Sequence, residues 1–142
     1  MSTQKKTGSC LCGSVQITAN AVSNHVGSCH CSMCRKWGGG PFLAVDCGTD
    51  VVFSGESNIG AFPSSQWADR GFCKKCGTHL FYRLTENQQY MMPASLFEQA
   101  ENFELKQEIF IDEKPDWYSF QNDTNKMTGA EVFAQFTQQQ DN

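Results

Sequence analysis

The chain has 142 residues, of which 39% are hydrophobic and 12% aromatic, so it is long enough to bury a core as one domain of ordinary size. Its formal net charge of −4 argues against the strongly basic surface of a nucleic-acid scaffold. The first residues lack the apolar stretch of a signal peptide, and no segment is long and apolar enough to cross a membrane. We therefore expect a cytoplasmic protein with no membrane partner.

Short strand-like runs alternate with Gly, Asn and Ser breaks, beginning with the alternating segment Ser14–Ala19. Further strands are expected at Val26–Cys29, Phe42–Asp46, Val51–Ser54, His79–Leu84, Tyr90–Ala94 and Lys106–Ile111. Helical signals are confined to Leu96–Asn102 and Thr128–Gln138. The pattern predicts a single, mainly β domain with little helix over residues 1–136, followed by a polar tail over residues 137–142.

Seven of the eight cysteines fall into three tight clusters, and Cys47 stands alone. The clusters are Cys10-Leu11-Cys12-Gly13, Cys29-His30-Cys31-Ser32-Met33-Cys34 and Cys73-Lys74-Lys75-Cys76-Gly77. Thiols one or two residues apart do not easily form disulfides with each other, but they can converge on one tetrahedral metal ion. In a reducing compartment such clusters are more often metal ligands than a disulfide scaffold.

The first and third clusters each supply a pair of sulfurs. Together they predict a closed four-thiolate zinc site made of Cys10, Cys12, Cys73 and Cys76. Such a zinc has no vacant position, so its role is expected to be structural. The alternative is that the two pairs bind separate partners or remain free thiols.

The middle cluster offers three sulfurs, from Cys29, Cys31 and Cys34, which predicts a second zinc with one position open for chemistry. His30 lies between the first two ligands, where it is a fourth ligand, a general base or a side chain pointing away; we favour the last two. Cys47 is the other candidate to close the site. Its place after an alternating run instead favours a buried, inert thiol.

Arg35 and Lys36 follow the triplet directly, and basic residues near thiolates lower thiol pKa and favour anionic ligands. The stretch Trp37-Gly38-Gly39-Gly40-Pro41 comes next. Its backbone N–H groups are candidates to bind a carboxylate or an oxyanion, and the alternative is an ordinary flexible connection.

The segments Gly8–Val15, Cys29–Lys36 and Gly71–Thr78 together resemble the glutathione-dependent formaldehyde-activating enzyme family, also called the CENP-V/GFA family. The resemblance continues in Pro93–Leu96 and Lys114–Tyr118. It implies a β-rich, Mss4-like fold with two zinc ions per chain, one structural on the four paired cysteines and one on the triplet. It also implies a carbon–sulfur lyase that joins glutathione to formaldehyde, giving S-hydroxymethylglutathione.

The resulting hypothesis is a zinc-dependent carbon–sulfur lyase that acts on a glutathione-like thiol and a small aldehyde, or on their adduct. Its candidate catalytic residues are His30, Arg35 and Lys36. The cations of Arg35 and Lys36 could bind the carboxylates of glutathione. Two other functions fit the same residues. One is a zinc-stabilised binding or scaffold module without catalysis, and the other is a thiol or zinc redox sensor.

Overall fold

The structure, a computed structural model, describes the backbone of residues 2–141 and the side chains of residues 2–137. It is mostly β, with 44% strand and 18% helix, which confirms the predicted fold class. The chain forms two compact units, and each unit is built from two separate segments. The first unit contains the chain up to Asn24 and Ala44–Phe103, and the second contains His25–Leu43 and the chain from Glu104 onwards.

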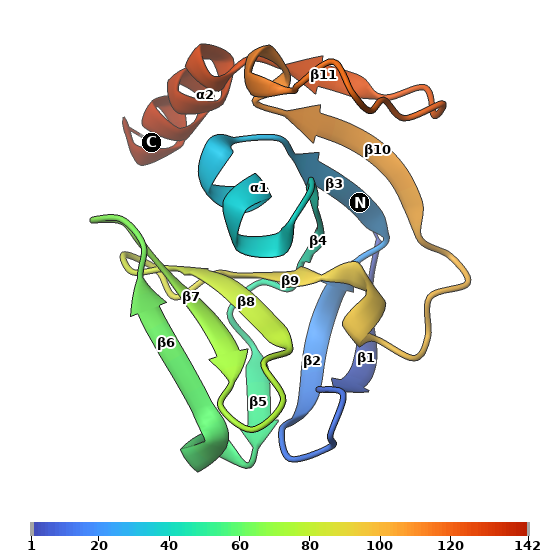
Figure 1. Cartoon of the computed structure of the whole chain (residues 1–142), viewed down its shortest axis with the longest axis vertical. Coiled ribbons are helices and arrows are strands. Elements are labelled where there is room, and N and C mark those ends of the chain that lie inside the picture. The colour runs from blue at the N-terminus through green and yellow to red at the C-terminus, as the bar shows by residue number, and fades with distance from the viewer. Residues whose placement is uncertain (1, 142) are drawn as a thin grey trace. The chain divides into compact units, whose positions relative to one another are not determined.

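The first unit holds two antiparallel groups of strands (Figure 1). One has the order β1-β2-β5 and consists of β1 (Thr3–Ser9), β2 (Gln16–Ser23) and β5 (Val51–Ser54). The other has the order β4-β9-β8-β7-β6. It consists of β4 (Phe42–Asp46, in this unit from Ala44), β9 (Tyr90–Pro93), β8 (His79–Leu84), β7 (Ala68–Cys73) and β6 (Ile59–Pro63). Two short 3₁₀ helices also lie in this unit: η1 (Glu56–Asn58) between β5 and β6, and η2 (Ala94–Leu96) directly after β9.

The core of the first unit is formed by the inward faces of these strands. Alternation along β2 buries Ile17 and Ala19, as the sequence pattern predicts. The ring of Phe81 on β8 is 1% exposed and meets the ring of Tyr90 edge-on, with centroids 5.2 Å apart. The same ring lies directly over Gly71 on β7, at a position where any side chain would collide with it.

The second unit combines a parallel sheet with two helices. The sheet has the order β11-β10-β3 and consists of β3 (His25–Cys29), β10 (Glu104–Ile109) and β11 (Asn125–Met127) (Figure 1). The helices are α1 (Ser32–Gly38) and α2 (Gly129–Asp141), and the 3₁₀ helix η3 (Ile111–Glu113) follows β10. None of the described helices is long and apolar enough to span a membrane.

Three predicted strands, those over Phe42–Asp46, Val51–Ser54 and His79–Leu84, have the predicted bounds. The helix predicted over Leu96–Asn102 is wrong. Only η2 is helical there and it ends at Leu96, because Phe97 pairs with Gly8 of β1 in an isolated antiparallel bridge. Helix α2 confirms the predicted C-terminal helix and continues through the expected polar tail as far as Asp141, while Asn142 lies outside the described residues.

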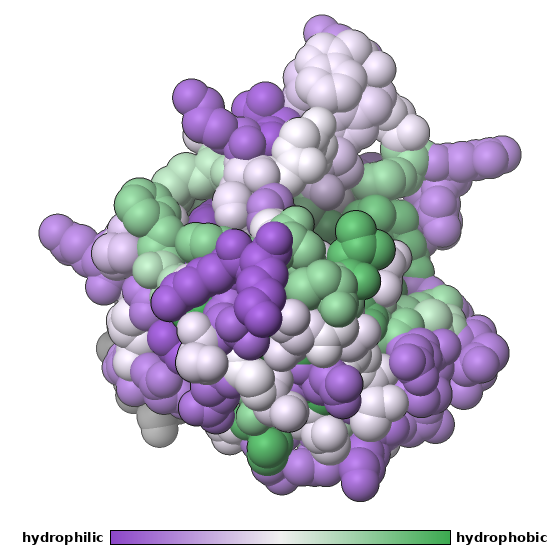
Figure 2. Space-filling view, turned by 60° about the horizontal axis from the view of Figure 1, so that its bottom comes forward, coloured by the Kyte–Doolittle hydropathy of each residue, from purple (hydrophilic) through white to green (hydrophobic). Residues whose placement is uncertain are grey.

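The surface carries large hydrophobic side chains at separate points of the chain, of which Leu11, Phe62 and Trp117 are the most exposed. On the face drawn in Figure 2, hydrophobic areas are interrupted by hydrophilic ones. Single exposed apolar residues of this kind are ordinary on folded proteins.

Candidate metal centres

The sulfur atoms of Cys10, Cys12, Cys73 and Cys76 converge in the first unit and all lie within 4.8 Å of one another. The Sγ of Cys12 is 3.6 Å from that of Cys10 and 3.9 Å from that of Cys73. A tetrahedral zinc with Zn–S bonds of about 2.3 Å places its sulfurs about 3.8 Å apart. None of these cysteines is in a disulfide. The donor set and its spacing therefore fit a zinc ion.

Two tight turns, each closed by a glycine, present these sulfurs. In one, the N–H of Gly13 donates to the carbonyl of Cys10 at 3.1 Å, and in the other the N–H of Gly77 donates to the carbonyl of Cys73 at 2.8 Å. Both glycines have positive φ, 81° and 79°, a conformation that residues with a Cβ rarely adopt. A hydrogen bond with Thr78 lowers the pKa of Cys76 to about 5, so this ligand is already prone to ionise.

The sulfurs of Cys29, Cys31 and Cys34 form the second group, within 4.8 Å of one another in the second unit. Cys29 ends β3, Cys31 is the N-cap of α1, and its Sγ accepts the N–H of Cys34 at 3.4 Å. Hydrogen bonds with Cys29 and Cys34 lower the pKa of Cys31 to about 2, whereas the same cluster raises the pKa of Cys29. Without a metal, the cluster thus favours the thiolate at Cys31 and the thiol at Cys29. A metal ion bound by all three sulfurs would displace the remaining thiol protons, because its ligands are thiolates.

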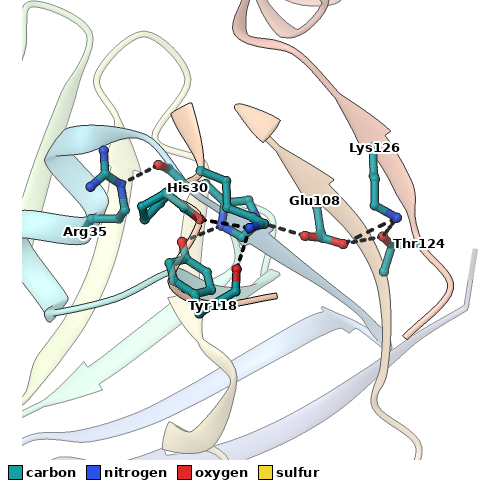
Figure 3. Close-up of polar contacts among 8 residues, drawn as sticks. His30, Arg35, Glu108, Tyr118, Thr124 and Lys126 are labelled. Carbon is teal, nitrogen blue, oxygen red and sulfur yellow. Dashed lines mark hydrogen bonds and ion pairs between the residues drawn. The ribbon is translucent and has the colours of Figure 1, made fainter. Parts of the chain in front are cut away.

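His30, the residue between the first two cysteines of this group, is completely buried. Its Nε2 lies 2.8 Å from Oε1 of Glu108 on β10, and its Nδ1 lies 2.7 Å from the hydroxyl of Tyr118 (Figure 3). Both ring nitrogens therefore have protein partners. The ring also lies beside that of Phe120, with centroids 5.8 Å apart.

The carboxylate of Glu108 is 2% exposed and is held from its other side as well. The hydroxyl of Thr124 donates to Oε2 at 2.5 Å, and Nζ of Lys126 lies 3.8 Å from the same oxygen. Burial alone would raise the pKa of Glu108, but the hydrogen bonds with Thr124 and His30 outweigh it and lower that pKa. Glu108 is thus a buried, ionised and fully partnered carboxylate.

Tyr118 is held in place by the segment that follows β10. Nζ of Lys114 donates to the carbonyl of Pro115 at 2.9 Å and to that of Tyr118, and it also lies 5.1 Å from the centre of the Tyr118 ring. The carboxylate of Glu113 accepts the N–H of Ser32, at the start of α1, at 3.0 Å. This segment therefore packs against the loop that carries the cysteine triplet.

The basic residues after the triplet occupy different environments. Arg35 is half-buried and its Nε donates to the carbonyl of His30 at 2.9 Å, whereas Lys36 is exposed in the last turn of α1. In the glycine stretch that follows, Gly39 adopts a φ of 86° and donates its N–H to the carbonyl of Arg35. That N–H therefore closes the helix and is not available to bind an anion.

Cys47 belongs to the first unit and is completely buried at the end of β4, a member of neither sulfur group. Its Sγ contacts the carbonyl of Val45 at 3.6 Å, and burial raises its pKa to about 12.

Sequence reasoning found all seven clustered cysteines but not Glu108 or Thr124. A glutamate inside a predicted strand gives no sign of burial, and its partner His30 lies 78 residues away.

Residues 5–113 match the model of the family described as glutathione-dependent formaldehyde-activating enzyme. The chain belongs to this GFA family. It is 38% identical over 126 residues to an uncharacterized lyase of Schizosaccharomyces pombe, a match that covers 88% of this chain and 92% of the relative. A crystal structure of a Rhodobacter sphaeroides protein shares the fold, with a TM-score of 0.57 and 24% identity over 66% of this chain and 88% of that one. Both sulfur groups lie within the region matched by the GFA model, and Tyr118 and Thr124 lie beyond it.

Proposed function

We propose that this GFA-family protein is a zinc-dependent carbon–sulfur lyase that acts on a glutathione-like thiol and a small aldehyde, or on their adduct. The observation that carries the proposal is the convergence of three sulfurs, from Cys29, Cys31 and Cys34, in a group that contains no fourth ligand among the described residues. Three protein ligands are the usual number at a catalytic zinc, whereas a structural zinc has four. The family description and the name of the yeast relative support a glutathione-related lyase.

The reaction needs one bond to form and one proton to move. In the synthetic direction the thiol sulfur bonds to the aldehyde carbon, and the π electrons of the carbonyl pass to its oxygen. That oxygen takes up a proton in place of the one that the thiol has lost, and the reverse reaction breaks the same carbon–sulfur bond. A bound zinc ion supplies the acidity for this chemistry, since it lowers the pKa of a thiol and polarises a carbonyl.

We assign the basic residues of α1 to the binding of the carboxylates of glutathione. Lys36 is exposed, and the half-buried Arg35 uses its Nε for the carbonyl of His30. A guanidinium pairs well with a carboxylate, and a lysine provides a mobile point charge. The buried ring of His30 acts, in this proposal, through its hydrogen bonds and not by contact with the substrate.

The four-sulfur group is proposed to hold a second, structural zinc. Its ligands come from the turn after β1 and from the end of β7, so the ion joins two parts of the first unit that are distant in sequence. We place the protein in the cytoplasm, because its cysteines are free thiols and glutathione keeps that compartment reducing. Catalysis by the triplet does not require the structural site to take part in the chemistry.

Native mass spectrometry of the purified protein with and without glutathione tests the metal content and the substrate together. We expect two zinc ions per chain and a glutathione adduct, and we expect Cys31→Ser to keep one zinc and lose the adduct. Cys47→Ala is the matched control, because Cys47 is a buried thiol outside both groups. It should keep both ions and the adduct.

The catalytic claim is tested by exchange NMR on a mixture of glutathione and formaldehyde. The zinc-loaded protein is expected to accelerate formation and breakdown of the hydroxymethyl adduct above the spontaneous rate, and Cys31→Ser is expected not to. A protein that holds two zinc ions but does not accelerate formation or breakdown of the adduct would contradict the lyase proposal. A zinc-stabilised binding module would then be the better description.

A further inference from the structure

We propose that Glu108, His30 and Tyr118 form a positioning unit that fixes the backbone between Cys29 and Cys31 and thereby determines how firmly the cysteine triplet retains its metal. The inference rests on the proposed metal site of the triplet, but not on the lyase reaction. None of these three residues is proposed as a ligand of the metal. They act on the loop that carries the ligands.

The first argument is that His30 is held at its backbone and at both ends of its ring. Its N–H donates to the carbonyl of Ile109 at 3.1 Å, and its own carbonyl accepts Nε of Arg35 at 2.9 Å. Its ring nitrogens meet Glu108 at 2.8 Å and Tyr118 at 2.7 Å. The peptide units on either side of His30 are those of Cys29 and Cys31. A rotation of this segment would therefore break several hydrogen bonds at once.

The second argument is that the sheet places the carboxylate where the loop needs it. β10 runs parallel to β3, with Glu108 in register with Ser28 and Ile109 in register with Cys29. The chain leaves β3 at Cys29, so His30 is the first residue beyond the strand. The carboxylate of Glu108 (Figure 3) and the backbone carbonyl of Ile109 both contact His30, and they come from two successive residues of the neighbouring strand.

The third argument is the free-energy cost of burying Glu108. An ionised carboxylate that is 2% exposed loses most of its hydration, and an apolar side chain would fill the same space without that loss. What the carboxylate provides is a fixed orientation for the imidazole ring of His30. It accepts a hydrogen bond from Nε2–H of His30, so in the neutral imidazole Nδ1 is the acceptor and the Tyr118 hydroxyl is the donor. We infer these proton positions from the partners of each atom.

Residues that orient metal ligands from outside the first coordination sphere commonly change metal affinity by about 10- to 100-fold when they are replaced. Such residues usually hydrogen-bond to a ligand itself. Here the contact is with the residue between two ligands, so the effect should appear in the triplet and not in the four-sulfur group, whose members lie in the other unit.

The test is the rate at which zinc leaves the two-zinc protein when a chromophoric chelator is added in excess. Cys31→Ser, which should hold zinc only at the four-sulfur group, identifies the phase that belongs to that group. We expect Glu108→Gln to accelerate release from the triplet by about tenfold or more. Tyr118→Phe should have a smaller effect because it removes one hydrogen bond. Release from the four-sulfur group should not change in either variant.

Glu104→Gln is the matched control. Glu104 lies on the same strand, but it is exposed and paired with Lys106 at 2.8 Å. This variant should release both zinc ions at the rates of the unmodified protein. Tyr118→Phe also keeps the inference testable if Glu108→Gln does not fold, since it retains the ring and loses only the hydroxyl.

Replacement of zinc by cobalt gives a readout that a general loss of stability would not move. The absorption bands of cobalt bound to thiolates depend on the ligand geometry, so we expect Glu108→Gln to shift the bands of the triplet alone. Equal acceleration of release from both groups, or release and spectra like those of Glu104→Gln, would overturn the inference. A protein that holds zinc only at the four-sulfur group would instead remove the metal site on which it rests, and native mass spectrometry distinguishes that result.

Discussion

The Sγ of Cys12 lies 3.9 Å from the Sγ of Cys73, although the two residues are 61 positions apart in the sequence. Cys12 belongs to the turn between β1 and β2, and Cys73 is the last residue of β7. A metal ion bound by both would close a long loop of chain, whose ends are costly to bring together in the unfolded state. The four-sulfur group is therefore placed to stabilise the first unit.

Cys73→Ser is expected to lower the free energy of unfolding by at least about 3 kcal/mol, or to prevent folding altogether, because a structural zinc contributes its binding free energy directly to folding. Thermal unfolding with zinc counted by mass spectrometry measures the change. Cys31→Ser should be milder and should lose only the other ion. A Cys73→Ser protein that melts like Cys47→Ala and holds both ions would contradict the structural role.

The sequence predicted the strands best where alternation and breaks coincide, as at Phe42–Asp46 and His79–Leu84. It missed β1, whose adjacent residues Lys5 and Lys6 are typical of a solvated segment. Lys6 is only 2% exposed in the structure, and its Nζ donates to the carbonyl of Gln99 at 2.6 Å and lies 4.8 Å from the centre of the Phe103 ring. A lysine stem can be buried when its ammonium group finds a distant carbonyl, and no local pattern reveals that partner.

Helix α1 was missed for a related reason. Its seven residues are too few to show a helical pattern of hydrophobic residues. Its stability depends on its two ends, with Cys31 as N-cap and Gly39 in the left-handed conformation as C-cap. The cysteine groups were predictable because ligand spacing is local. The partners of His30 were not, because Glu108 and Tyr118 lie 78 and 88 residues further along the chain.

Lys36→Ala is expected to raise KM for glutathione, the proposed thiol substrate, by about two- to fivefold with kcat little changed, since one exposed ion pair contributes up to about 1 kcal/mol. Lys36 is exposed on α1, so its removal should leave the zinc content unaltered. Steady-state kinetics over a range of glutathione concentrations gives both parameters. Lys5→Ala, which removes one exposed lysine of β1, is the control for net charge. Equal kinetics in both variants would remove Lys36 from the substrate site.

His79→Gln is expected to flatten the pH dependence of stability. Burial and, to a smaller extent, the nearby Arg70 lower the pKa of His79 below its usual value of about 6.5. A histidine with a lowered pKa in the folded state contributes stability that is complete above its unfolded pKa and is lost as the pH falls through the folded value. Urea unfolding at about pH 5 and about pH 7 should therefore show a smaller difference in the variant than in the unmodified protein. The exposed His25, replaced by Gln, serves as the comparison, and an unchanged difference in His79→Gln would refute the assignment.

Gly71→Ala is expected to destabilise the first unit by about 1 to 3 kcal/mol, the usual cost of forcing extra volume into a packed core. A Cβ at this position would stand 2.2 Å from the ring of Phe81, which is itself 1% exposed and enclosed by Phe53 and Tyr90. Because the ring is buried between two other rings, we expect that relieving the clash displaces neighbouring core side chains or shifts β7 against β8. Gly27→Ala is the matched control, because Gly27 also lies in a strand but its Cβ would meet only a carbonyl oxygen at 3.9 Å.

Urea unfolding of the zinc-loaded variants measures this difference. The double variant Gly71→Ala/Phe81→Leu separates the clash from other effects of the substitution. Because the smaller side chain makes room for the new methyl group, the cost of Gly71→Ala should be smaller in the Phe81→Leu background than in the unmodified one, a positive coupling between two residues in contact. If the two substitutions are additive, the ring of Phe81 does not limit position 71. In that case we would attribute the cost of Gly71→Ala to the register shift of the β7–β8 ladder between Gly71 and Phe72.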